Sequence, residues 1–244
     1  MLRWRSADFS LWRNCVPIAP KAADSIRRFY RLGDDYMDGR VETLLKYGTQ
    51  AGVEKFVILP VSLRPTNTRH INEFIIEQVA KEPRFYGYGT IHAGMLDLCE
   101  EVEFIMANGL RGLKMHTDCQ VFPIDDPRLF AAYEEIQGKL PVIFHMGDAR
   151  YNYSHPAQLR KVLDLFPNLQ VIAAHFGGYR MYEEAYEFLY HKDCIFDVSS
   201  SMMFMKEGDA ERYIRIYGAE RMAFGTDYPL WDPVLETKRF QQLK

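Results

Sequence analysis

The sequence lacks the features of a membrane protein, a secreted protein or a nucleic-acid-binding protein. No apolar run approaches the roughly 20 residues that span a bilayer, and the N-terminal segment has no continuous apolar core of a signal peptide. The formal net charge of -3 provides no basic surface for nucleic acid or an anionic membrane. We therefore expect a cytoplasmic protein that binds neither.

Several common site types are also missing. The four cysteines are scattered and form no C-x-x-C pair, which favours reduced thiols over disulfides or a cysteine-bound metal. No glycine-rich phosphate-binding motif follows the first recognisable strand, which weakens a dinucleotide-binding sheet. The serines at 199–201 lack a G-x-S-x-G context, so a nucleophilic serine is not expected. Asp197, inside the preceding apolar run, is expected to be structural.

What the sequence does contain is a regular alternation of buried apolar runs and helical stripes. This alternation is typical of βαβ units, whose strands are parallel. The runs that predict strands lie at 55–62, 84–92, 109–116, 140–145, 169–175, 194–199 and 222–227. Residues 21–32 could form a short helix, whereas residues 1–20 show no clean period.

Seven such units and one obscure N-terminal unit predict an α/β fold, a (β/α)8 barrel of the TIM type. We expect one domain over residues 1–244, with 1–20 as an atypical N-terminal segment. The first strand is expected to be atypical or incomplete. The last helix is expected to be truncated, because the chain ends inside it.

Four successive predicted strands end in a histidine, and the last predicted strand ends in a carboxylate. These residues are His92, His116, His145, His175 and Asp227. The C-terminal ends of barrel strands meet at one face, where barrel enzymes carry their chemistry. Imidazole and carboxylate groups gathered there suit one divalent metal, zinc above all.

The residue types suggest how such a site would work. A metal lowers the pKa of a bound water, and Asp227 beside it can act as general base. His116 and His92 can hydrogen-bond the substrate. Lys114 can pair with a substrate carboxylate, or it can form a structural ion pair inside the barrel. Arg150 can anchor an anion or remain a solvated loop charge.

Three segments resemble the metal-dependent amidohydrolase superfamily: Phe144-His145, residues 174–178 and residues 224–229. The branch they resemble includes aminocarboxymuconate-semialdehyde decarboxylase, and residues 112–116 resemble its fourth-strand motif. The resemblance implies a (β/α)8 barrel, one divalent ion, usually zinc, and cleavage of C–N, C–O or C–C bonds. It also implies that His145 and Asp227 are metal ligands. His175 would be a second-metal ligand in binuclear members or the catalytic imidazole in mononuclear ones.

One departure from the family concerns its first strand, which normally supplies two metal ligands as an H-x-H pair. No histidine precedes His70 here, and the pair would fall near residues 10–12. We therefore expect an altered first strand. With His145, His175 and Asp227 as its metal ligands, the site should bind the ion more weakly, although three protein ligands can hold zinc.

These observations lead to a metal-dependent hydrolase in which metal-bound water attacks a small-molecule substrate. Asp227 would be the base, and His175 would stabilise the developing charge. A non-oxidative decarboxylase of a small carboxylic acid is the alternative, and a substrate carboxylate on Lys114 would favour it. A metal-free, inactive barrel lacking the H-x-H pair is the second alternative. The protein partner that we consider is a second copy of this chain, in a homodimer.

Overall fold

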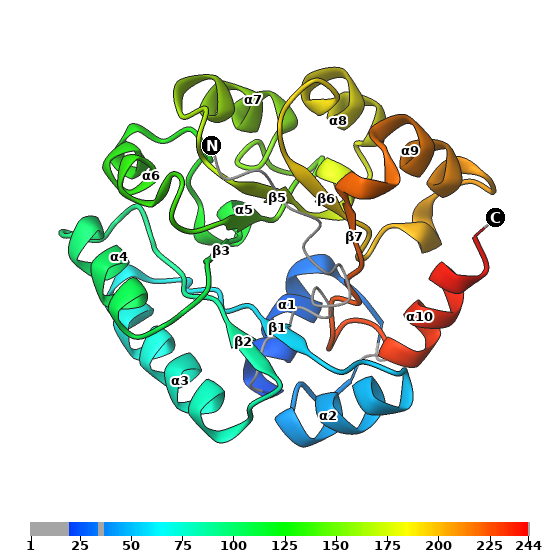
Figure 1. Cartoon of the computed structure of the whole chain (residues 1–244), viewed down its shortest axis with the longest axis horizontal. Coiled ribbons are helices and arrows are strands. Elements are labelled where there is room, and N and C mark those ends of the chain that lie inside the picture. Colours follow the sequence, from blue (N-terminus) through cyan, green and yellow to red (C-terminus); the bar gives the residue numbers. More distant parts are fainter. Residues whose placement is uncertain (1–19, 34–36, 244) are drawn as a thin grey trace.

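The computed structural model describes residues 20–33 and 37–243 and shows parallel strands inside a ring of helices (Figure 1). The strands are β1 (Phe56–Ile58), β2 (Phe85–Gly87), β3 (Leu113–Met115), β4 (Val142–Phe144), β5 (Val171–Ala173), β6 (Ile195–Asp197) and β7 (Met222–Ala223). They pair in sequence order as β1-β2 and β3-β4-β5-β6-β7, every pair parallel. A parallel bridge between Gly89 and Leu113 joins the two sheets.

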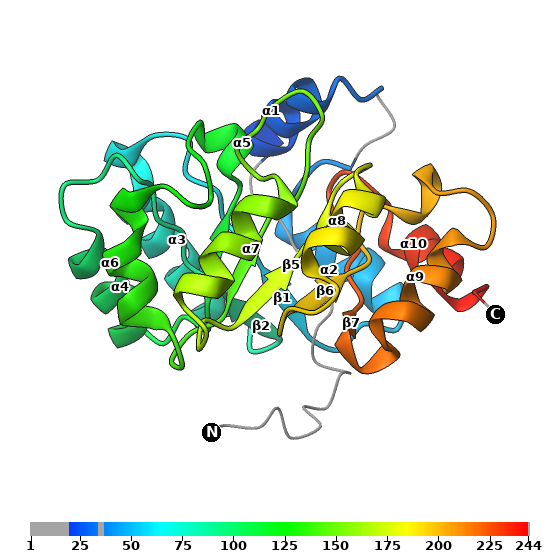
Figure 2. The same ribbon diagram turned by 90° about the horizontal axis from the view of Figure 1, so that it is seen from above.

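The helices alternate with these strands and cover their outer side (Figure 1). They are α1 (Pro20–Tyr30), α2 (Val41–Gln50), α3 (Thr68–Lys81), α4 (Leu98–Ala107), α5 (Thr117–Gln120), α6 (Phe130–Ile136), α7 (Pro156–Leu165), α8 (Tyr182–Leu189), α9 (Asp209–Tyr217) and α10 (Pro233–Gln241). Two of them, α1 and α5, leave the ring and lie over one end of the barrel (Figure 2). Within the described ranges, no helix is both long and apolar enough to cross a bilayer.

All seven predicted strands are present, each shorter than the apolar run that predicted it. The short helix predicted over 21–32 is α1. The final helix, α10, spans nine residues after β7. The expected first strand of the barrel, near residues 10–12, lies outside the described residues, as does almost all of the atypical segment 1–20.

Strand side chains alternate between two apolar layers, as the period of two requires. The outward layer packs against the helices and includes Phe56, Met115 and Phe144. The inward layer is a separate cluster, which comprises Val57, Leu59, Tyr88, Ile143, Ile172, Ala174, Ile195 and Ala223. Lys114 is in register with Ile143, so it points into the barrel at the level of this inner layer.

The same alternation carries the strand-end residues inward, with one exception. His145 lies two residues after Ile143 and so continues the inward series. His175 lies two residues after Ala173, which belongs to the outward layer. The backbone of His175 is left-handed (φ 61°), and this turn redirects its imidazole to the inside, where it lines the cavity. Such a conformation costs a residue with a Cβ of order 1 kcal/mol and is common at functional sites.

Gln120 ties the ends of three strands together on the side where α1 lies. Its buried side-chain amide donates to the carbonyls of Ser62 (3.0 Å) and Ile91 (2.9 Å). Its carbonyl accepts the main-chain N–H of His116 (3.0 Å). These bonds link the segments that follow β1, β2 and β3 at the point where the cavity begins.

Gln120→Leu should therefore destabilise the fold. It keeps the volume but leaves three buried main-chain groups without partners, at about 1 kcal/mol or more for each. We expect the free energy of unfolding in urea to fall by about 3 kcal/mol. Gln50→Leu, at an exposed position at the end of α2, is the control and should change it little. Equal stability of the two variants would show that Gln120 does not organise these strand ends.

Candidate active site

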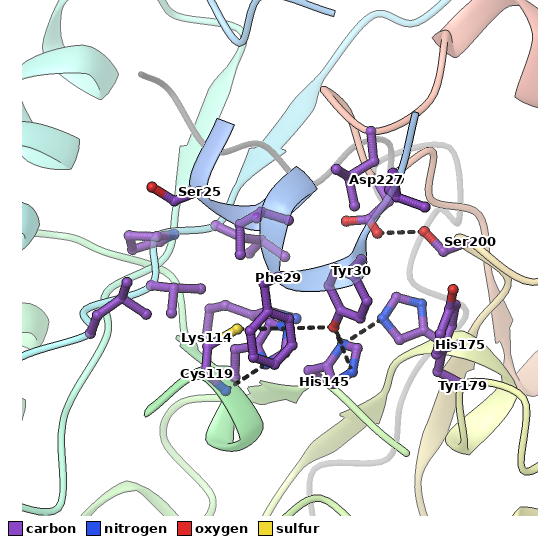
Figure 3. A pocket seen from close by; sticks show the side chains of 18 of the residues that line it. Ser25, Phe29, Tyr30, Lys114, Cys119, His145, His175, Tyr179, Ser200 and Asp227 are labelled. Atoms are coloured by element: carbon purple, nitrogen blue, oxygen red, sulfur yellow. Dashed lines mark hydrogen bonds between the residues drawn. The ribbon is translucent and has the colours of Figure 1, made fainter. Parts of the chain in front are cut away.

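A cavity of about 420 Å³ lies where the C-terminal ends of the strands meet α1 (Figure 3). Of the residues expected to form the site, five line this cavity: Lys114, His116, His145, His175 and Asp227. They come from the ends of β3, β4, β5 and β7. Parallel strands far apart in the sequence therefore bring these side chains to one place.

His92, expected to bind substrate, lies away from the cavity. The chain turns directly after it, so its Nδ1 accepts the main-chain N–H of Gly94 (3.0 Å). Its ring packs edge-on against Phe122, with ring centroids 5.0 Å apart. The structure does not bring His92 into the cavity, because β2 ends at Gly87 and the residues that follow it form a loop rather than an extended strand.

His145 and His175 present their ring nitrogens to each other, with Nδ1 of His145 2.9 Å from Nε2 of His175. The other nitrogen of each ring faces a main-chain carbonyl: His145 Nε2 is 3.0 Å from Gly147 O, and His175 Nδ1 is 2.9 Å from Ser199 O. Metal-binding histidines typically donate their second N–H to such a carbonyl. In the tautomers that the carbonyls select, the two facing nitrogens carry lone pairs.

This arrangement fits a divalent ion. Two nitrogens bound at about 2.1 Å to one ion and at a right angle to each other are about 3 Å apart. Burial lowers the pKa of His116 and His145 well below the usual imidazole value, and neighbouring cationic groups lower it further. Both rings are therefore neutral near pH 7, the form in which imidazole binds a metal.

Asp227 stands in the same cavity and has a left-handed backbone (φ 56°). Its carboxylate accepts a hydrogen bond from the hydroxyl of Ser200 (2.5 Å). The indole of Trp231 donates to that hydroxyl (2.8 Å). In the view of Figure 3 the ring of Tyr30 lies between Asp227 and His145, with its hydroxyl toward His145. One oxygen of the Asp227 carboxylate is thus bound by the Ser200 hydroxyl, and the carboxylate forms part of the cavity wall.

Among the described residues, His116, Asp118 and His145 form the group whose potential ligand atoms all lie within 4.8 Å of one another, and Asp227 does not belong to it. The rings of His116 and His145 are stacked, with centroids 3.8 Å apart and planes 7° from parallel. Lone pairs in parallel planes cannot both point at one ion, so the pair of His145 and His175 suits a metal better. Asp118 was missed from the sequence because no apolar run ends on it.

Tyr30 of α1 inserts its hydroxyl into the histidine cluster (Figure 3). The oxygen lies 2.7 Å from Nε2 of His116 and 3.0 Å from Nε2 of His145. Burial, together with the nearby carboxylate of Asp227, raises the pKa of Tyr30 well above the usual phenol value. The hydroxyl is therefore neutral and can both donate and accept a hydrogen bond.

Arg150 holds α1 in this position. Its guanidinium donates to the carbonyl of Phe29 (2.6 Å) and pairs with the buried Asp148 (2.6 Å). It also stacks over the rings of Phe29 and Tyr151, at 4.8 and 5.3 Å from their centroids. Of the two roles considered from the sequence, an anion anchor and a solvated charge, neither describes this residue.

Lys114 faces the histidines from β3 and has no anionic partner among the residues that the structure describes. Its side chain is 8% exposed and lines the cavity. Within residues 20–33 and 37–243 it makes no ion pair and no hydrogen bond through its ammonium group. A structural ion pair inside the barrel, one of the two roles considered, is therefore not formed by the described residues.

The family model for amidohydrolases matches residues 8–244. The chain belongs to the amidohydrolase family. The resemblance seen in the strand-end motifs is confirmed at the level of this family. The protein is an enzyme of hydrolase or lyase type. No curated protein matches this amidohydrolase.

Solved structures with the same fold include 5-carboxyvanillate decarboxylases. The enzyme from Sphingomonas paucimobilis is 16% identical, with a TM-score of 0.66 over 95% of this chain and 92% of that one. A mutant of the enzyme from Novosphingobium aromaticivorans is 13% identical, with a TM-score of 0.71 over 95% and 90% of the two chains. That structure contains manganese and 3-methoxy-4-hydroxy-5-nitrobenzoic acid. At these identities the likeness confirms the TIM-type barrel fold of the amidohydrolase.

Arg150→Lys should loosen α1. Lysine can still pair with Asp148, but it cannot also bind the Phe29 carbonyl and stack on the aromatic rings. We expect hydrogen exchange of the α1 amides to accelerate about tenfold, corresponding to about 1.4 kcal/mol of lost local stability. Arg160→Lys, at an exposed position on α7, is the control. Unchanged exchange in α1 would contradict a role for Arg150 in holding it.

Asp118 should make the stability of the metal-free protein depend on pH. Burial raises the pKa of Asp118 to about 6, whereas the unfolded value is about 3.9. The folded state therefore holds this proton longer, and the free energy of unfolding should fall as pH rises from about 4 to about 6. With a chelator present to keep the protein metal-free, the free energy of unfolding should decrease between pH 4.5 and 7.5. This decrease should be about 2 kcal/mol smaller for Asp118→Asn than for the wild-type chain. Equal losses in urea denaturation would contradict the raised pKa.

Proposed function

We propose that this amidohydrolase is a divalent-metal-dependent decarboxylase of a small carboxylated ring compound. The observation that carries the proposal is Lys114, a buried cation in the cavity without an anionic partner among the described residues. Burying an uncompensated charge is costly, and an incoming carboxylate removes that cost. The site therefore favours an anionic substrate over a neutral amide.

The shape and walls of the cavity support a flat ring as the rest of the substrate. Phe29, Tyr30, Tyr179 and Trp231 supply aromatic faces, and apolar side chains from the segment after β1 and from α3 also line the cavity. Aromatic rings pack against one another by stacking or edge contacts. A volume of about 420 Å³ is in the range of small-ligand sites.

His145, His175 and Asp227 would hold the metal, through Nδ1, Nε2 and a carboxylate oxygen. When bound, the ion supplies positive charge that stabilises negative charge developing on the substrate. Zinc remains the metal we favour for a site with two imidazoles. Manganese, present in the Novosphingobium structure, is the other ion to test.

In the proposed reaction the bond between the ring carbon and the carboxylate carbon breaks, CO2 leaves, and a proton takes its place on the ring carbon. Lys114 positions the carboxylate through its charge. The apolar walls exclude water from it, which strengthens this attraction. Asp227 or His175, at the edge of the same cavity, would take up a proton from solvent and then transfer it to the ring carbon, whose electron pair is left by the departing CO2.

Hydrolysis, the reaction first expected from the sequence, is the second candidate. It would use the same three ligands, with Asp227 as base for a metal-activated water and His175 stabilising the developing charge. Lys114 and the decarboxylase neighbours favour the first candidate. A metal-free barrel, the third alternative, would contain no ion and show neither activity.

The test begins with elemental analysis of protein purified without added metal and after loading with Zn²⁺ or Mn²⁺. A panel of ring carboxylates is then assayed for CO2 release, and a panel of amides and esters for hydrolysis. We expect about one metal per chain and CO2 release from a subset of the carboxylates. Lys114→Met should lower kcat/KM at least 100-fold, which corresponds to about 3 kcal/mol for a buried charge-assisted contact.

Lys46→Met, at an exposed position on α2, is the matched control and should leave kcat/KM unchanged. Hydrolysis of neutral substrates without CO2 release from any acid would support the second candidate. Full activity of Lys114→Met on a carboxylate would remove the reason for proposing decarboxylation. No bound metal after loading would support the metal-free barrel.

A further inference from the structure

Asp197 and Ser199 form a hydrogen-bonded pair behind His175, on the side away from the cavity. Asp197 is the last residue of β6, and Ser199 lies two residues further on. One oxygen of Asp197, Oδ1, accepts the Ser199 hydroxyl, the main-chain N–H of Ser199 (2.8 Å) and the main-chain N–H of His175 (3.4 Å). All three residues are buried.

The direction of these bonds determines how Ser199 meets the imidazole. The Ser199 hydroxyl gives its only proton to Asp197, so its oxygen can act only as an acceptor toward His175. That oxygen lies 3.2 Å from Nδ1 of His175, and the Ser199 carbonyl lies 2.9 Å from the same nitrogen. Two acceptors therefore face Nδ1, and the proton of the neutral ring must reside there.

We infer that Asp197, acting through Ser199, is a positioning residue that keeps His175 protonated on Nδ1 and leaves its Nε2 bare. The bare nitrogen faces Nδ1 of His145 at 2.9 Å, and Figure 3 shows both rings turned into the cavity. This is the form in which His175 can bind a metal or take up a proton.

Asp197 also supports the backbone that turns His175 inward. Its bond to the main-chain N–H of His175 joins the end of β6 to a residue with φ 61°. The neighbouring strand thus fixes both the direction of the imidazole and the location of its proton. A carboxylate of purely structural value would require only the main-chain bonds and would not select a tautomer.

The consequence for metal binding or proton transfer rests on the proposed function, whereas the tautomer does not. The tautomer can be read in metal-free protein by two-bond ¹⁵N–¹H correlation spectra of the histidine rings. His175→Gln assigns the signal. We expect a protonated Nδ1 and an unprotonated Nε2 in the wild-type chain.

Two variants separate the roles of the pair. Asp197→Asn supplies an amide that can donate to Ser199, so the hydroxyl can turn its proton toward His175 and shift the tautomer toward Nε2–H. Ser199→Ala keeps the bonds of Asp197 to both main-chain N–H groups and keeps the carbonyl of residue 199 as an acceptor for Nδ1, but it removes the hydroxyl as the second acceptor. It should therefore fold and lower the fraction of the Nδ1–H tautomer. Asp193→Asn, an exposed carboxylate before β6, controls for the charge change.

Metal affinity, measured by competition with a chromophoric chelator, is the second readout. Asp197→Asn should weaken it 10- to 100-fold, the range found for partners of metal-bound histidines, and Asp193→Asn should not. Protonated Nε2 in the wild type would overturn the inference. So would an unchanged tautomer in Asp197→Asn or, where that variant does not fold, in Ser199→Ala. If the protein proves to be a hydrolase, the tautomer result stands by itself.

Discussion

The alternation of side chains along seven parallel strands is the constraint on which the site depends. Because strands in register turn the same positions inward, Lys114 and His145 reach one cavity from β3 and β4, although the sequence separates them widely. The inward apolar layer fills the barrel interior around and below Lys114. The other inward polar side chains of the site therefore collect at the strand ends, where the apolar series stops.

The site itself combines neutral rings with a cation, Lys114, that no described residue neutralises. Burial keeps the imidazoles of His116 and His145 uncharged, so they place no extra positive charge beside Lys114. Such surroundings attract groups that bring their own negative charge or supply a metal to neutral nitrogen ligands. A neutral substrate would gain little from Lys114, and this difference in charge separates an acid-binding enzyme from an amide hydrolase built on the same barrel.

The sequence predicted the barrel and most of the cavity because both depend on local patterns. Apolar runs ending in His116, His145, His175 and Asp227 mark strand ends without knowledge of long-range contacts. His92 does not line the cavity, because β2 stops earlier than the apolar run suggests. The location of α1, its contacts with Arg150 and the inward turn of His175 depend on contacts between distant segments. A local pattern of apolar residues in the sequence does not reveal such contacts. Asp197 was expected to be structural, and its link to His175 becomes visible only when β5 and β6 are side by side.

The bond from Arg150 to the Phe29 carbonyl joins residues 121 positions apart. During synthesis α1 is translated before Arg150, because Arg150 follows β4. At about 5–20 residues per second, that interval is on the order of ten seconds. For this time Tyr30 and the apolar face of α1 have no histidine cluster to cover. The helix α1 can therefore be held over the cavity only after β4 and Arg150 have been translated.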